Sequence, residues 1–144
     1  MFGKASRRAM TMTLAFGLLL GGTVATHQDA HAEEGALFHL SVANGKAKVG
    51  EAGTITVTVT AGQGHKANGE YPNKIKNLSV AGSAELAATT VSGRVSGGSI
   101  TYSVGITPTA AGTHNVTGEI RFSVCSDTAC HIEKLPLDAT ITGE

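Results

Sequence analysis

A strict alternation of apolar and polar side chains over residues 54–60 is the feature that most constrains the fold. The segment reads Thr-Ile-Thr-Val-Thr-Val-Thr, so Ile55, Val57 and Val59 lie on one face of an extended chain and the threonines lie on the other. A period of two is typical of a strand with one buried face, and β-branched residues favour strands. The segment is therefore predicted to be a half-buried β-strand.

The same period recurs along the chain, and glycine-containing turn signals separate the repeats. The further predicted strands are Phe38 to Val42, Lys74 to Val80, Glu85 to Val91, Ile100 to Thr107, Val116 to Val124 and Leu135 to Thr142. No segment after residue 32 has a convincing helical period. Short alternating strands in this number predict an all-β fold, an immunoglobulin-like antiparallel β-sandwich of about seven to eight strands. A small closed barrel is the alternative.

Residues 1–32 have the composition of a secretory signal peptide. Basic residues begin the segment, residues 12–24 are mostly apolar, and Ala30-His31-Ala32 provides small residues for cleavage before Glu33. The apolar stretch is shorter than the roughly 20 residues of a membrane span. The predicted mature chain, residues 33–144, is thus one exported domain without a membrane span. It would lie in the periplasm or outside the cell, where a disulfide can persist.

The charge balance excludes some partners. The signal peptide holds three of the eleven Lys and Arg residues and one of the eleven Asp and Glu residues, so the mature chain has a formal charge of −2. A nucleic-acid partner requires a basic patch, which this composition does not supply. No nucleic acid partner is expected, and the oligomeric state is left open.

The only two cysteines, Cys125 and Cys130, are separated by four residues near the end of the sequence. They fall between two alternating runs, which predicts a hairpin with residues 126–129 as its loop. That register sets Cys125 against Cys130, Ile120 against Leu135 and Val116 against Ala139. Cys125 would then lie on the polar face of its strand, toward solvent or under a loop.

Three uses of the cysteine pair remain open from spacing alone. A structural disulfide that closes so short a loop contributes only about 2 kcal/mol in the chain-entropy model. A redox-active pair would exchange its bond with other thiols. A metal clamp would use Cys125, Cys130 and His131, but no second ligand motif completes a tetrahedral site, so neither a metal nor a cofactor is expected. Motifs of hydrolases and transferases are also missing.

Two segments resemble a known family. Val124-Cys-Ser-Asp-Thr-Ala-Cys130 resembles the cysteine hairpin of the amino-terminal periplasmic domain of the thiol:disulfide interchange protein DsbD, and Gly64-His-Lys-Ala-Asn-Gly-Glu-Tyr-Pro72 is similar to another segment of such domains. The resemblance implies an immunoglobulin-like domain that passes reducing equivalents between thioredoxin-like partners through Cys125 and Cys130. The family usually has prolines after its second cysteine, where this chain has His131-Ile132-Glu133. Only fourteen residues follow Cys130, so any electron donor is expected to be another periplasmic thiol protein.

The expected function is therefore thiol-disulfide exchange, with a non-catalytic secreted binding or accessory domain as the alternative. A protonated His131 would favour the thiolate of adjacent Cys130, whereas Asp127 would oppose it. Two loops, residues 61–73 and 92–99, are candidates to cover the cysteines. His65 in the first loop is expected to bond a local carbonyl or to pack beside Tyr71 rather than to act as a ligand.

Overall fold

The structure is a computed structural model and describes residues 37–144. The predicted signal peptide, its cleavage site and the first residues of the predicted mature domain lie outside the described residues. The described residues form eleven β-strands in two sheets. Within residues 37–144, no helix has the length and apolar character needed to cross a membrane.

One sheet has five strands in the order β1-β3-β9-β6, with β8 also paired to β9. Its strands are β1 (Phe38–Ala43), β3 (Gly53–Ala61), β6 (Ala84–Leu86), β8 (Arg94–Ser96) and β9 (Ser99–Pro108). The other sheet has six strands in the order β2-β11-β10-β5-β7, with β4 also paired to β10. Its strands are β2 (Gly45–Ala47), β4 (Lys66–Ala67), β5 (Lys74–Ala81), β7 (Val91–Ser92), β10 (Gly112–Cys125) and β11 (Cys130–Gly143).

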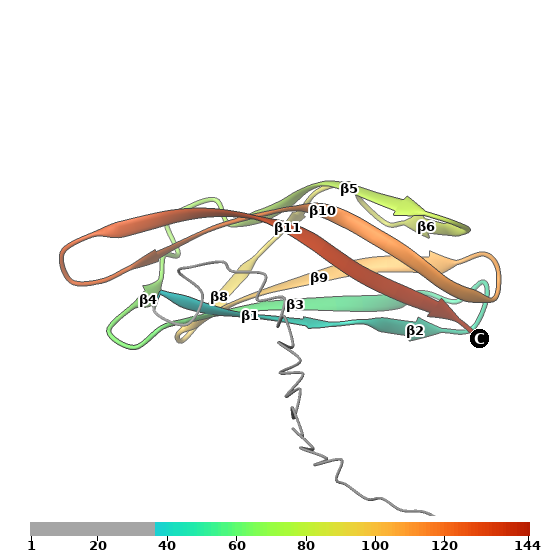
Figure 1. Cartoon of the computed structure of the whole chain (residues 1–144), viewed down its shortest axis with the longest axis horizontal. Coiled ribbons are helices and arrows are strands. Elements are labelled where there is room, and N and C mark those ends of the chain that lie inside the picture. Colours follow the sequence, from blue (N-terminus) through green and yellow to red (C-terminus); the bar gives the residue numbers. More distant parts are fainter. Residues whose placement is uncertain (1–36) are drawn as a thin grey trace, which may run out of the picture.

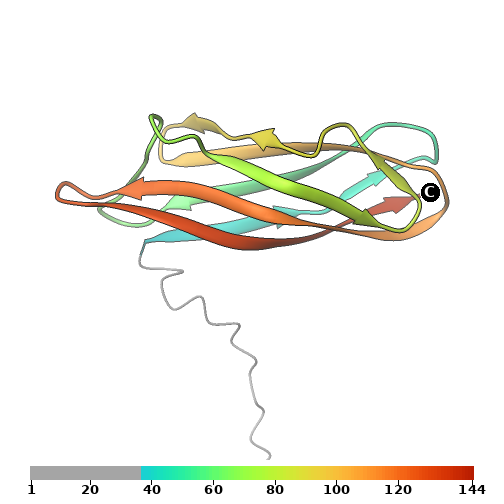
Figure 2. The same cartoon turned by 90° about the horizontal axis from the view of Figure 1, so that it is seen from above.

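The two sheets pack face to face as a β-sandwich, as Figure 1 shows from the side and Figure 2 from above. Ile55, Val57 and Val59 are fully buried, as their alternation predicts, and the core is filled from both sheets. Phe38 of one sheet contacts Phe122 of the other edge to face, with ring centroids 4.9 Å apart. The predicted immunoglobulin-like sandwich is confirmed. All strand pairs are antiparallel except β2 with β11.

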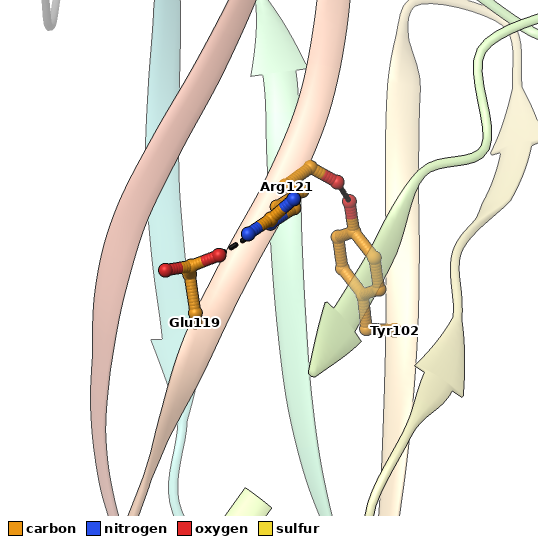
Figure 3. A network of polar contacts seen from close by, with 3 residues as sticks. All are labelled: Tyr102, Glu119 and Arg121. Carbon is orange, nitrogen blue, oxygen red and sulfur yellow. Dashed lines mark hydrogen bonds and ion pairs between the residues drawn. The ribbon is translucent and has the colours of Figure 1, made fainter. Parts of the chain in front are cut away.

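A polar contact also joins the sheets inside this core. The hydroxyl of Tyr102 on β9 is fully buried and donates a hydrogen bond of 3.1 Å to the backbone carbonyl of Arg121 on β10 (Figure 3). The Arg121 side chain points the other way and donates to Glu119, a pair that is partly exposed. Burial raises the pKa of Tyr102, and the charge of Tyr71 raises it further.

Two local predictions differ from the structure. The strand predicted from Glu85 to Val91 is divided into β6 and β7, which belong to opposite sheets, because the chain crosses from one layer to the other between them. Residues 92–99, predicted to be a loop, contain β8, which forms a tight hairpin with β9. Gly93 precedes β8 where a Cβ atom would lie 2.6 Å from Ile100 and 2.7 Å from Tyr102, so only glycine fits there.

The first strands change sheets at Asn44. β1 pairs with β3 in one sheet, and β2 pairs with the end of β11 in the other. The Asn44 side chain marks the change, because its Oδ1 accepts a hydrogen bond of 2.9 Å from the backbone N–H of Thr140. β2 therefore pairs only with residues 141–143 of β11. Asn44 accepts the backbone N–H of Thr140, the residue of β11 just before that paired segment.

Candidate functional site

The cysteines lie at the closed end of the β10–β11 hairpin. The ladder runs without a register shift from Gly112 opposite Gly143 to Cys125 opposite Cys130, and it includes the predicted pairs of Ile120 with Leu135 and of Val116 with Ala139. The predicted register is confirmed. The two cysteines form a disulfide, with their Cα atoms 4.0 Å apart.

The hairpin turn explains how the sulfur atoms come together. The backbone N–H of Ser126 donates to the carbonyl of Ala129 at 2.8 Å, and the Ser126 hydroxyl accepts from the N–H groups of Thr128 and Ala129. Ser126 and Ala129 are thus a hydrogen-bonded pair. Because such pairs alternate with non-hydrogen-bonded ones, Cys125 and Cys130 occupy a non-hydrogen-bonded position, where opposed backbones come closest.

The loop over residues 61–73 covers the Cys125 side of the hairpin. Its β4 segment pairs with the end of β10 and sets Lys66 opposite Cys125 and Ala67 opposite Val124. The backbone N–H of Asn68 then donates to the carbonyl of Ser123 at 2.9 Å. Of the two loops considered from the sequence, this is the one that lies against the cysteine strand.

Asn73 fastens the end of this loop to β10. Its side chain is buried, its Oδ1 accepts a hydrogen bond of 3.0 Å from the N–H of Ser123, and its Nδ2 donates to the carbonyl of Asn68 at 2.9 Å. Ser123, a serine on the polar side of β10, is fully buried as a result. The polar face of the strand is therefore covered where it reaches the disulfide.

The two cysteines differ in exposure for this reason. Cys125 is 8% exposed, whereas Cys130 is exposed at the tip. The expectation that Cys125 lies under a loop agrees with the structure. A molecule in solution therefore reaches the disulfide from the Cys130 side.

Two histidines flank the end of β10. His65 precedes β4 on one side and His131 lies opposite Val124 on β11 on the other, and their ring centroids are 6.2 Å apart. The Nδ1 atom of His65 lies 3.1 Å from the carbonyl of Gln63, as expected for a histidine that bonds a local carbonyl. Both rings are partly exposed. The structure thus brings His65 beside His131, although the two residues are far apart in sequence.

Lys66 is a residue of the site that sequence reasoning missed. Opposed residues of an antiparallel ladder share a face, with Cβ atoms about 4.5–5.5 Å apart, so Lys66 projects on the same side as Cys125. Its place depends on the pairing of β4 with β10, and a two-residue strand has no readable period. Asp127 lies exposed in the turn. Of the predicted site residues, Cys125, Cys130, His131 and Asp127 therefore lie within one short hairpin end.

Within residues 37–144, no group of three or more His, Cys, Asp or Glu side chains is placed to hold a metal ion. The covalent state of the sulfurs also matters, because a disulfide offers no thiolate ligand. The chemistry that these residues offer is exchange of the disulfide with a thiol that approaches the tip.

The class of protein that fold and site define is an all-β sandwich domain with a disulfide at the end of a long hairpin. No family model matches the chain, and no curated protein matches it. Among solved structures, it is similar to AggA, the major subunit of aggregative adherence fimbriae type I from Escherichia coli, with 10% identity and a TM-score of 0.41 over 74% of this chain and 94% of that chain. A likeness at this level supports no conclusion about function.

Proposed function

We propose that this chain is an exported thiol-disulfide exchange domain, with Cys125 and Cys130 as the exchanging pair and a thioredoxin-like protein as the partner. The observation that carries the proposal is the unequal exposure of the two cysteines, since Cys130 is open at a projecting tip and Cys125 lies under a loop. The resemblance of residues 124–130 to the DsbD cysteine hairpin agrees with it.

The limited stabilising effect of the disulfide also supports an exchange role. The hairpin is already held by a continuous ladder and by a turn with its own hydrogen bonds. Closing six residues adds only about 2 kcal/mol in the chain-entropy model. A bond that contributes little to the fold can be opened without unfolding the domain.

In the reducing direction, a partner thiolate attacks Sγ of Cys130, the disulfide breaks, and Cys125 leaves with the electron pair as a thiolate. A second thiolate of the partner then attacks the partner sulfur of this mixed disulfide and releases the Cys130 thiolate. The partner ends oxidised to a disulfide, and this domain ends with two thiols after proton uptake from water. Oxidation of the domain follows the same steps in reverse.

Single-cysteine variants test the proposed direction of attack. Reduced Cys125→Ala, which keeps Cys130, is expected to form a stable mixed disulfide with a thioredoxin variant that keeps only its attacking cysteine, activated as a mixed disulfide with thionitrobenzoate. Cys130 displaces thionitrobenzoate as a thiolate, and neither protein then holds a second thiol that could resolve the product. Reduced Cys130→Ala keeps the covered Cys125 and is expected to react more slowly. Gel electrophoresis under non-reducing conditions measures both rates. Equal rates for the two variants would contradict the role given to Cys130.

A non-catalytic binding or accessory domain with a structural disulfide is the second candidate. The observation in its favour is that Cys125 also pairs with β4, so the bridge helps to hold the strand on which the 61–73 loop rests. Alkylation trapping of the protein in its own compartment separates the two functions. A measurable reduced fraction supports exchange, whereas a fully oxidised pair with a reduction potential below roughly −300 mV supports the structural role.

A further inference from the structure

The free edge of β11 suggests a contact that the proposed function does not require. β10 pairs with all of β11, whereas β2, on the other side, covers only residues 141–143. Among the described residues, no strand pairs with that other side of residues 130–140. A free edge presents backbone donors and acceptors to any strand that can align with it.

The hydrogen-bond pattern shows which groups point outward. Cys125 with Cys130 is a non-hydrogen-bonded pair, so Cys130, Ile132 and Lys134 direct their backbone N–H and C=O groups away from β10. The same alternation places the N–H of Thr140 outward, where Asn44 accepts it. Pro136 has no N–H to offer. By the same alternation Asp138 also points outward, between Pro136 and Thr140, so the longest uninterrupted part of the open edge is residues 130–134.

This open edge carries an exposed apolar side chain. Ile132 is 59% exposed, and the only other exposed large apolar side chain among residues 37–144 is Val49, at 43%. Soluble proteins protect sheet edges with charges and prolines, and on this edge the first charge is Glu133, followed by Lys134 and Pro136. An apolar side chain at the centre of an open edge favours a strand as the partner.

We propose that a second copy of this chain pairs with this edge, antiparallel, through residues 130–134 of both copies and about a two-fold axis at Ile132. In this register Ile132 faces Ile132 of the partner subunit as a hydrogen-bonded pair. Cys130 faces Lys134 of the partner subunit, and these two residues also form a hydrogen-bonded pair. Each disulfide thereby gains a lysine from the other copy.

Charge complementarity favours this register over the symmetric ones centred on Glu133 or Lys134. Two-fold pairing requires a central residue that faces itself. A centre at Glu133 or Lys134 would place like charges in direct opposition, which is destabilising. The centre at Ile132 instead sets His131 against Glu133 of the partner subunit, on a non-hydrogen-bonded pair where side chains come closest.

The shape of the molecule permits this pairing. The closed end of the β10–β11 hairpin projects beyond the other strands in both views (Figures 1 and 2). In an antiparallel overlap of the two projecting ends, the bodies of the two sandwiches lie on opposite sides of the contact. Five residues per copy form a small interface, and interfaces of small area are typically weak or transient.

Sedimentation velocity of the purified exported protein, from low micromolar to millimolar concentration, tests the proposal. A reversible monomer–dimer equilibrium is expected. Ile132→Lys is expected to raise the dissociation constant by about tenfold or more, because it opposes two like charges at the axis. Val49→Lys, an equivalent change of an exposed apolar side chain elsewhere, is the matched control and should leave the constant unchanged. A wild-type protein that stays monomeric overturns the proposal, as does equal dimerisation of Ile132→Lys and the wild type.

Amide hydrogen exchange gives the second readout. The outward N–H groups of Cys130, Ile132 and Lys134 should exchange more slowly as concentration rises, and the Ile132→Lys variant should lose this protection. Concentration-dependent protection on β1 instead would place the contact on the other sheet and overturn the proposed edge.

Discussion

The hydroxyl of Tyr102 donates a hydrogen bond to the backbone carbonyl of Arg121 and so ties the five-stranded sheet to the strand that ends in the disulfide (Figure 3). Tyr102→Phe removes the donor and leaves the ring in place. The lost hydrogen bond is expected to lower the free energy of unfolding by about 1 kcal/mol. Urea denaturation measures the change. Tyr71→Phe, at a partly exposed site, is the control and should have a smaller effect.

The raised pKa of Tyr102 predicts how stability responds to alkaline pH. Burial favours the neutral phenol in the folded state, so the unfolded chain loses this proton first as pH rises past about 10. The stability that Tyr102 contributes is complete below that pH and is lost above it. Unfolding measured from pH 8 to pH 11 should show a steeper loss for the wild type than for Tyr102→Phe. Parallel curves would mean that Tyr102 ionises as easily in the folded protein as in the unfolded one.

Long alternating strands made much of the fold predictable. The hairpin register followed from two runs of alternation on either side of a four-residue loop, because a shift by one residue would move every apolar side chain to the wrong face. Ile55, Val57 and Val59 likewise lie in the core that their pattern indicates.

The strands that sequence reasoning missed are two or three residues long. β4 and β8 have no period that could be recognised, and their places depend on pairing with β10 and β9. The candidate site was accordingly predicted only in part. Its cysteines lie within one hairpin, whereas Lys66 and the contact of His65 with His131 depend on a loop that returns from elsewhere in the chain.

Asn73 is predicted to hold the loop over Cys125. Asn73→Ala leaves the buried N–H of Ser123 without its acceptor, which should lower the free energy of unfolding by about 1–3 kcal/mol. The loosened loop should also let a small thiol such as dithiothreitol reduce the disulfide faster. Asn115→Ala, at an exposed position on the same strand β10, is the control. Loss of stability without faster reduction would show that the loop does not limit access to the sulfur atoms.

Lys66 is predicted to assist the release of Cys125. When a thiolate attacks Cys130, negative charge develops on the Cys125 sulfur, and Lys66 lies opposite that residue on β4. Interactions of an exposed lysine contribute up to about 1 kcal/mol, so Lys66→Gln should slow reduction by dithiothreitol by up to about fivefold.

Salt dependence separates this electrostatic role from a structural one. Salt screens charges on the protein surface, so the difference in rate between the wild type and Lys66→Gln should shrink as ionic strength rises to about 1 M. Lys46→Gln, on β2 at the far end of β11, is the control and should leave the rate unchanged. A Lys66→Gln rate that is low at every salt concentration would indicate that the substitution disturbs β4, and that the charge of Lys66 has no part in the exchange.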